Sequence, residues 1–176
     1  MNVYKAVLLD LDGVVWTRYG AIDKSPDATH LFKENGIKVF YLTNNSHRSQ
    51  QETFDKLVSY GFYVESLANI VTSPFLTYKQ LEYDGVKVVC GKPNVLISEH
   101  LKKMFALEKT EVVMVGDNLE TDVKLGINCG YRSVLVETGV HSRADIEKLK
   151  IKPSKIFKSL YDMACNVNNE REQVNY

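Results

Sequence analysis

The stretch Val7-Leu8-Leu9-Asp10-Leu11-Asp12-Gly13-Val14-Val15-Trp16 begins as a continuous apolar run and then changes to two aspartates and a glycine. An uninterrupted apolar run is typical of a strand that is buried on both faces of a parallel sheet. The carboxyl ends of such strands open onto ligand crevices, so we expect Asp10 at a crevice. Because residues i and i+2 of an extended chain point to the same side, Asp12 can reach the same ligand. The alternative is a polar turn that merely closes the strand at Gly13.

The chain has 176 residues, a length that fits one domain with a sizeable core. We expect a single domain over residues 1–165 and a polar, frayed tail over residues 166–176. The 22 Lys and Arg residues balance the 22 Asp and Glu residues. No overall charge therefore favours nucleic acid or a membrane surface as a general partner.

The cysteines and the N-terminus bear on the cellular compartment. Cys90, Cys129 and Cys165 are too few and too widely spaced for a disulfide framework or a zinc site, which fits a reducing cytosol. The first residues lack the basic and apolar regions of a signal peptide. No apolar stretch of the sequence is long enough to span a bilayer. The sequence therefore predicts a cytoplasmic protein.

Short apolar runs alternate with amphipathic segments along the chain. Beyond the first run, strands are predicted at 37–42, 70–72, 86–90, 112–115, 132–136 and 156–157. Helices are predicted at 25–35, 47–60, 73–83, 95–104, 122–127, 142–149 and 159–165. Residues 16–23 are expected to form a small hairpin or flap beside Asp10. This alternation predicts a three-layer, Rossmann-like α/β fold, with a parallel sheet and helices on both faces.

Polar or charged residues follow four of the predicted strands: Asp10 and Asp12, then Thr43, then Lys92, and finally Asp117 with Asp122. Each of them alone has an ordinary structural explanation, as a strand-end hydroxyl, a solvated charge or a turn acid. Their joint placement at the carboxyl ends of successive strands favours a ligand site, because open α/β sheets bind ligands at that edge.

These groups suit phosphoryl transfer through a covalent aspartyl-phosphate. Asp10 is the candidate nucleophile, and Asp12 can serve as general acid and base. Because a carboxylate and a phosphate repel each other, a cation is needed between them, and an all-oxygen site that includes Asp117 suits Mg²⁺. Lys92 and the Thr43 hydroxyl would stabilise charge on the transferred oxygens.

Four segments also resemble the motifs of a known family, the haloacid dehalogenase-like hydrolases. Within that family the resemblance is to the branch of the NagD and 4-nitrophenyl-phosphate phosphatases. The four segments, in chain order, are Leu9-Asp10-Leu11-Asp12-Gly13-Val14-Val15-Trp16, Leu42-Thr43-Asn44-Asn45-Ser46, Gly91-Lys92-Pro93 and Val115-Gly116-Asp117-Asn118-Leu119-Glu120-Thr121-Asp122. The following Gly126, Gly130 and Thr138-Gly139-Val140 fit the C-terminal run of the branch, so the resemblance covers residues 4–165.

The resemblance implies a catalytic domain that hydrolyses a phosphomonoester with the help of Mg²⁺. Asp10 would be the nucleophile and a magnesium ligand. Asp12 would be the acid and base, and its backbone carbonyl would bind the metal. Asp117 would be the main metal anchor, and Asp122 would support the site without touching the metal.

By the same resemblance, Thr43, Asn44 and Lys92 would hold the phosphoryl group. His47, just after this loop, is expected to be solvated, with a contact to substrate as the alternative. The resemblance also keeps a second possibility open, a catalytically idle binding or regulatory module. Retention of Asp10, Asp12 and Lys92 favours the enzyme.

One departure from the branch concerns the cap domain. In the branch a whole cap domain separates the second and third motifs, whereas here only residues 47–90 lie between them. We expect the cap to be missing, or reduced to a loop near residues 81–85. The flap at residues 16–23, a second copy of the chain in a homo-oligomer, or a phosphorylated macromolecule could then cover the site.

Overall fold

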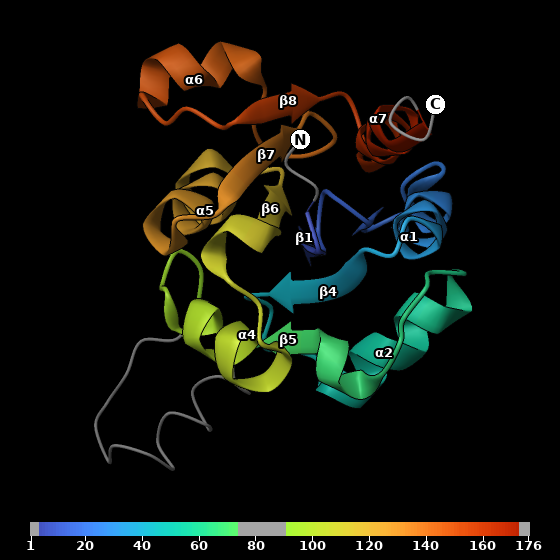
Figure 1. Ribbon diagram of the computed structural model, residues 1–176. Helices are drawn as coiled ribbons and strands as arrows, with labels where there is room; N and C mark the ends of the chain where they lie inside the picture. The colour runs from blue at the N-terminus through green and yellow to red at the C-terminus, as the bar shows by residue number, and fades with distance from the viewer. Residues whose placement is uncertain (1–3, 74–90, 173–176) are drawn as a thin grey trace.

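The computed structural model describes residues 4–73 and 91–172, and six parallel strands form one central sheet. Across the sheet the order is β5-β4-β1-β6-β7-β8, so β1 lies between β4 and β6 (Figure 1). The strands are β1 (Ala6–Asp10), β4 (Lys38–Thr43), β5 (Ile70–Thr72), β6 (Val112–Gly116), β7 (Arg132–Val136) and β8 (Lys155–Phe157).

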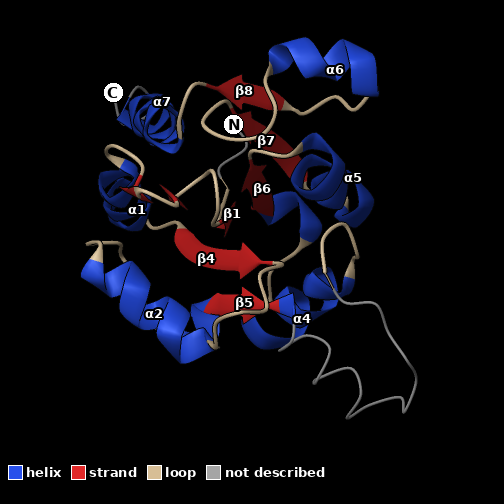
Figure 2. Cartoon of the chain, turned by 180° about the vertical axis from the view of Figure 1, so that it is seen from behind, coloured by secondary structure: helices blue, strands red, loops and turns tan. Residues whose placement is uncertain are grey.

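Helices cover both faces of this sheet, which confirms the predicted three-layer fold. One face carries α1 (Ser25–Glu34), α2 (Gln50–Ser59) and α7 (Leu160–Glu172), and the other carries α4 (Leu96–Phe105), α5 (Lys124–Cys129) and α6 (Arg143–Leu149). The view from behind shows the same layers, with the sheet running between the two groups of helices (Figure 2). Two single-turn 3₁₀ helices, Leu67–Asn69 and Lys109–Glu111, lead into β5 and β6.

The composition of β1 explains why it is central. All five of its residues are buried. Val7 and Leu9 pack into the core beneath α1 and α7, whereas Ala6 and Leu8 pack into the core beneath α4 and α5. Because both faces are covered, only apolar side chains fit along the strand until its carboxyl end, where Asp10 emerges.

The predicted hairpin after β1 is confirmed. Strands β2 (Trp16–Thr17) and β3 (Gly20–Ala21) pair in antiparallel orientation. The predicted start of α2 at residue 47, after β4, is wrong, because the helix begins at Gln50. Ser49 caps it: Ser49 Oγ accepts from Glu52 N at 3.2 Å, and the Glu52 carboxylate accepts from Ser49 N at 2.7 Å. His47 and Arg48 therefore belong to the loop.

The predicted frayed tail from residue 166 is also wrong for the part that the structure describes. Helix α7 continues to Glu172. Val167 is buried in the same core as β1, and Asn168 Oδ1 accepts a 2.9 Å hydrogen bond from Asn35 Nδ2. The polar composition of this segment conceals one apolar face, which packs against α1.

One further segment differs from the prediction, and two predicted elements lie outside the described residues. A π-helical turn, Leu119–Val123, precedes α5, so helical structure starts three residues earlier than predicted. The helix predicted at 73–83 and the strand predicted at 86–90 fall almost entirely outside the described residues. Between Thr43 and Gly91, the described chain forms α2, a 3₁₀ turn and β5, all of them parts of the core fold.

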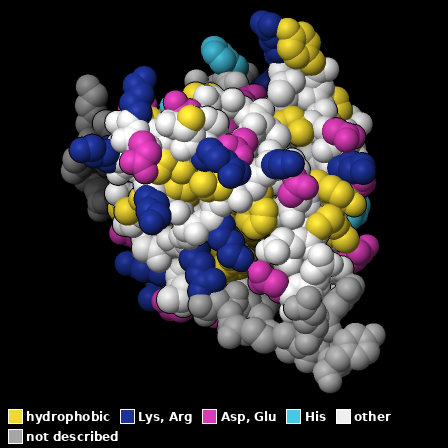
Figure 3. Space-filling view, turned by 90° about the horizontal axis from the view of Figure 1, so that it is seen from above, with side chains coloured by type: hydrophobic (Ala, Val, Ile, Leu, Met, Phe, Trp, Pro, Cys, Tyr) yellow, Lys and Arg dark blue, Asp and Glu magenta, His cyan; other side chains and the backbone are white. Residues whose placement is uncertain are grey.

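The surface carries both signs of charge. On the face seen from above, basic and acidic side chains alternate among scattered apolar ones (Figure 3). Among the described side chains of this face, basic and acidic groups are therefore mixed, without a large patch of one sign of the kind that binds nucleic acid. Among the residues that the structure describes, no helix is both long and apolar enough to cross a membrane.

Packing of α7 beyond residue 165 predicts a stability effect. Val167→Ala should lower the free energy of unfolding by about 1 to 2 kcal/mol, because it leaves a void in a buried core. Val58→Ala on α2 is the matched control, since Val58 is half exposed and should change stability by less than about 0.5 kcal/mol. Urea unfolding of both variants tests this, and equal losses would contradict the packing of α7.

Candidate active site

The carboxyl ends of β1, β4 and β6 lie side by side because these three strands are neighbours in a parallel sheet. A cleft of about 230 Å³ opens at this edge. Every candidate site residue predicted from the sequence lines it: Asp10, Asp12, Thr43, Asn44, Lys92, Asp117 and Asp122. His47 is exposed and does not line this cleft, as expected for a solvated side chain.

A buried lysine connects two of the carboxylates. Lys92 Nζ forms an ion pair with Asp10 Oδ1 and lies 2.7 Å from Asp122 Oδ1. The Lys92 side chain is only 4% exposed. Burial alone would lower the pKa of Lys92, but the charges of Asp10 and Asp122 outweigh burial and raise it. The lysine is therefore held as a cation in the floor of the cleft.

Burial has the opposite consequence for the acids. Burial raises the pKa of Asp10 to about 7, Lys92 opposes this shift, and Asp122 and Asp117 add to it. Burial also raises the pKa of Asp117, against a lowering hydrogen bond from the Val140 backbone. The cleft thus holds more negative charge than the single lysine compensates.

Glycines allow the backbone to close around Asp117. A Cβ on Gly13 would lie 2.3 Å from Asp117 Oδ2, and a Cβ on Gly139 would lie 1.9 Å from the same atom. Gly13 also has a φ of +86°, which side-chain-bearing residues rarely adopt. Asp117 Oδ2 accepts a 2.7 Å hydrogen bond from Val140 N. The loop after β1 and the loop after β7 therefore fix this carboxylate from two sides.

Asp122 is placed by the turn that follows β6. Asn118 caps this turn, since its Oδ1 accepts from Glu120 N at 2.9 Å and from Thr121 N at 3.2 Å. Asp122 Oδ2 accepts from Asn118 N at 3.1 Å, which leaves Oδ1 directed at Lys92. A Cβ on Gly116 would lie 2.1 Å from Asp122 Cβ, so only glycine fits there.

The carboxylates of Asp10, Asp117 and Asp122 fit a hard divalent cation. One oxygen from each of them lies within 4.8 Å of the others. Carboxylate oxygens are the ligands that Mg²⁺ prefers, and the excess negative charge would be relieved by a bound cation. The residues that converge here are the predicted ligands Asp10 and Asp117 together with Asp122, while the side chain of Asp12 turns elsewhere.

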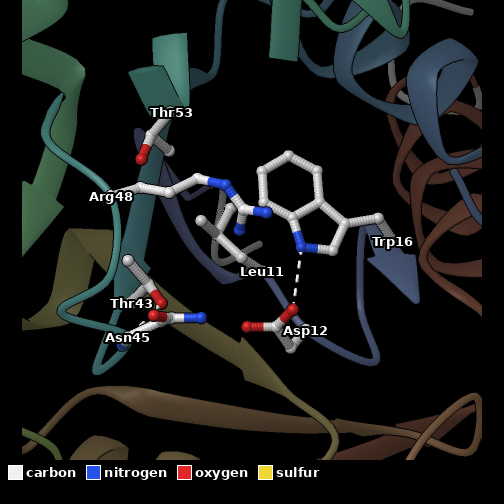
Figure 4. A pocket seen from close by; sticks show the side chains of 7 residues that line it. All are labelled: Leu11, Asp12, Trp16, Thr43, Asn45, Arg48 and Thr53. Atoms are coloured by element: carbon white, nitrogen blue, oxygen red, sulfur yellow. Dashed lines mark hydrogen bonds between the residues drawn. The ribbon is translucent and has the colours of Figure 1, made fainter. Parts of the chain in front are cut away.

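Asp12 points toward the hairpin. Its Oδ1 accepts a 2.9 Å hydrogen bond from Trp16 Nε1, and Trp16 is itself buried (Figure 4). Asp12 therefore stays in the cleft but outside the cluster of three carboxylates. Two neighbouring acids with different surroundings suit two different chemical roles.

Thr43 ends β4, Asn44 follows it, and both line the cleft. Thr43 Oγ1 accepts from Asn45 N at 3.0 Å, and the hydroxyl can still donate its proton. Asn44 Oδ1 accepts from Lys92 N at 2.8 Å, and Asn44 Nδ2 donates to the Lys92 carbonyl at 3.1 Å. Asn44 thus anchors the lysine loop to the end of β4. Its predicted contact with substrate stays a prediction.

Some residues near the cleft were not singled out from the sequence. Arg48 and Thr53 line a small pocket next to Asp12, and Lys56 lies over the Trp16 ring. The helix-start pattern of Ser49 and Glu52 could have placed Arg48 in the loop, since the capping box is visible in the sequence. Nothing in the sequence pattern indicates that Lys56 reaches across to the hairpin.

The fold is a Rossmann-like α/β fold. Its cleft, lined by carboxylates and a lysine, lies at the carboxyl ends of the central strands of the sheet. The chain matches a family model described as haloacid dehalogenase-like hydrolase over residues 7–118, and one described as HAD-hydrolase-like over residues 89–163. The first match alone spans more than half of the chain. The chain therefore belongs to the haloacid dehalogenase-like hydrolases.

The chain is also similar in sequence to individual curated phosphatases. The chain is 22% identical to 5'-nucleotidase YutF of Bacillus subtilis over 249 residues, which cover 91% of this chain and 97% of that protein. The aligned length exceeds the 176 residues of this chain, so the relative contains additional sequence between its matched ends. This agrees with a reduced cap.

Two solved structures share the fold. The 4-nitrophenylphosphatase from Thermotoga maritima superposes with a TM-score of 0.84 at 22% identity, covering 93% of this chain and 97% of that one. NagD from E. coli K-12 superposes with a TM-score of 0.81 at 19% identity, covering 90% and 98%. These likenesses confirm the predicted NagD-like fold.

The raised pKa of Asp10 predicts how stability depends on pH when divalent cations are chelated. The pKa is about 7 in the folded protein, whereas an unfolded aspartate has a pKa of about 3.9. Between these values the folded state binds more protons than the unfolded state. The contribution of Asp10 to stability is therefore present below about pH 4 and is lost as the pH rises through about 7.

Thermal unfolding in a chelator, from about pH 4 to 9, measures this loss. Asp10→Asn should remove it, so the variant should have a higher Tm than the wild type at the upper end of the range. Asp55→Asn, at an exposed carboxylate on α2, is the control and should follow the wild-type curve. Parallel curves for Asp10→Asn and wild type would show that Asp10 is not a destabilising buried acid.

Proposed function

We propose that this protein is a phosphatase that hydrolyses phosphomonoesters through an aspartyl-phosphate on Asp10. The observation that carries the proposal is the position of Asp10, which lies at the carboxyl end of the central strand, beside a buried lysine and two further carboxylates. The names of the relatives support it, since YutF is a 5'-nucleotidase and the Thermotoga maritima structure is a 4-nitrophenylphosphatase.

In the first step, a carboxylate oxygen of Asp10 attacks phosphorus, and the bond between phosphorus and the ester oxygen breaks. Asp12 donates a proton to the departing oxygen, so the product leaves as an alcohol. Lys92 and the Thr43 hydroxyl face the cleft and stabilise the charge that gathers on the transferred oxygens.

In the second step, Asp12, now a carboxylate, takes a proton from water. The water oxygen attacks phosphorus, the bond to Asp10 breaks, and inorganic phosphate is released. The hydrogen bond from Trp16 Nε1 holds the Asp12 carboxylate on one side of the cleft throughout this cycle. Asp12 therefore serves as acid and then as base without changing place.

Asp10, Asp117 and the backbone carbonyl of Asp12 would hold Mg²⁺, with Asp122 close enough to adjust the site. When bound, the ion supplies positive charge that lets an anionic carboxylate approach an anionic phosphate. Lys92 orients Asp10 toward the cleft, and the glycines around Asp117 fix the direction of that carboxylate.

The open cleft bears on how a substrate binds. The described residues place no separate domain over the cleft, so we infer that a phosphorylated small molecule binds largely through its phosphoryl group. A second copy of the chain or a phosphorylated macromolecule would supply further cover. We also propose that the protein acts in the cytoplasm, where its cysteines stay reduced.

Replacing the nucleophile tests the proposal. Asp10→Asn should lower kcat with 4-nitrophenyl phosphate by more than about 10³-fold, because the amide keeps the volume but attacks phosphorus poorly. Circular dichroism and thermal unfolding should show that the variant is folded. If Asp10→Asn kept more than about a few per cent of wild-type kcat, a covalent intermediate on Asp10 would be wrong.

Metal exchange tests the role of the carboxylates. Protein stripped by a chelator should be inactive, and added Mg²⁺ should restore activity. Ca²⁺ should not restore it, because calcium accepts more ligands at longer distances and would let Asp10 bind too loosely or through both oxygens. Phosphate release is measured on the same sample before and after each addition. Full activity of the stripped protein in excess chelator would exclude the metal from the reaction.

A further inference from the structure

A second, smaller pocket adjoins the catalytic cleft. Asp12, Thr43 and Asn45 line both. The remaining walls of the small pocket come from Leu11, Trp16, Arg48 and Thr53 (Figure 4). The hydrogen bond between Trp16 and Asp12 runs along its edge, so the small pocket lies on the Asp12 side of the site.

Arg48 forms part of the wall of this pocket and is itself exposed. Figure 4 shows its side chain extending from the loop into the pocket, with the guanidinium group directed toward the indole ring of Trp16. The free space that remains is about 10 Å³, the volume that one water molecule needs. The small pocket has no room for a substrate group, so an anion would reach Arg48 from its exposed side. The capping box at Ser49 fixes the backbone directly after it.

A second cation lies nearby. Lys56 Nζ is 3.9 Å from the centre of the Trp16 ring, on the helix that begins just after Arg48. Burial lowers the pKa of Lys56, the charge of Arg48 lowers it further, and Asp12 opposes both. Lys56 thus lies close enough to Arg48 and to Asp12 for its charge to interact with both.

Glu52 and Asp12 are the acids near these two cations, and the charge of Arg48 helps to lower the pKa of Glu52. The Glu52 carboxylate is engaged in capping Ser49, at 2.7 Å from its backbone nitrogen and 2.9 Å from its hydroxyl. Within residues 4–73 and 91–172, neither the Arg48 guanidinium nor the Lys56 ammonium forms an ion pair. Beside Asp12 the site therefore presents two cations that form no direct ion pair with a described carboxylate.

We propose that Arg48, assisted by Lys56, forms a subsite for a second anionic group, a carboxylate or a phosphate, on the leaving group of the substrate. The proposal rests on the proposed function, because Asp12 protonates the leaving oxygen and groups beside Asp12 therefore face the leaving group. A guanidinium group binds carboxylate and phosphate oxygens with two parallel hydrogen bonds, which gives it a geometric preference for these anions.

Two pairs of aryl phosphates isolate the charge of the leaving group. The first pair is 4-carboxyphenyl phosphate and 4-carbamoylphenyl phosphate, and the second pair is the corresponding 3-substituted compounds. The two compounds of a pair have similar size and differ by one negative charge. For the wild type, kcat/KM should be about tenfold higher for the carboxylate in at least one pair, mainly through a lower KM. Arg48→Gln should bring this ratio close to one, and Lys56→Gln should reduce it partly.

Lys155→Gln is the control for net charge, because Lys155 lies on β8 at the opposite edge of the sheet. It should leave the ratio at its wild-type value. Loss of a cation beside Asp12 can change the rates of both compounds in a pair, so the ratio within the pair is the measured quantity. A ratio that Arg48→Gln does not change, while the carbamoyl compound slows, would make Arg48 a support for Asp12 and would contradict the subsite.

The outcomes separate the two proposals. If all four compounds are hydrolysed at equal kcat/KM within each pair, the subsite is wrong and the phosphatase proposal stands. If none of the four, nor 4-nitrophenyl phosphate, releases phosphate in the presence of Mg²⁺, the phosphatase proposal is wrong and the subsite falls with it. A carboxylate preference that depends on Arg48 and decreases with added salt supports both.

Discussion

This site depends on the buried Lys92 ammonium, which forms ion pairs with Asp10 and Asp122. Three carboxylates converge on the cleft, and burial raises the pKa of Asp10 and of Asp117. Without the lysine, these acids would be buried without a counter-charge, which typically costs several kcal/mol. With the lysine, the cluster still carries excess negative charge. A bound cation would compensate this excess negative charge, and the cation would in turn attract a phosphate.

The parallel sheet makes this arrangement possible. Asp10, Thr43 and Asp117 come from three strands that are neighbours in space but distant in the sequence, and parallel pairing brings their carboxyl ends to one edge. Glycines then allow close approach of the backbone, at Gly13 and Gly139 around Asp117 and at Gly116 against Asp122. The apolar core fixes the strands, and the strands fix the acids. Chemistry at this edge therefore depends on packing far from it.

Much of this was predictable from local sequence patterns. The apolar run of β1 indicates a strand covered on both faces, and the alternation of strands and helices indicates the parallel sheet. Strand ends in a parallel sheet share an edge, so the convergence of Asp10 and Asp117, which end β1 and follow β6, agrees with the fold. The predicted residues line one cleft in the structure, and their chemical roles stay predictions.

The features that were mispredicted or missed depend on contacts between distant segments. The polar sequence after residue 165 suggests a frayed tail, but Val167 packs into the core beneath α1 and the helix continues. Trp16 is buried by tertiary contacts with Tyr60 and Phe62, and Lys56 covers its ring. These contacts join α2 and the segment after it to the hairpin. Sequence periodicity within one helix cannot indicate which hairpin that helix meets.

The central claim is that Asp10 carries the phosphoryl group during turnover. Borohydride added to the enzyme during turnover of 4-nitrophenyl phosphate with Mg²⁺ would reduce an aspartyl-phosphate to homoserine, which peptide mass spectrometry locates in the chain. The account predicts homoserine at position 10 that appears only when substrate and Mg²⁺ are both present. Continued phosphate release with unmodified Asp10 would contradict it.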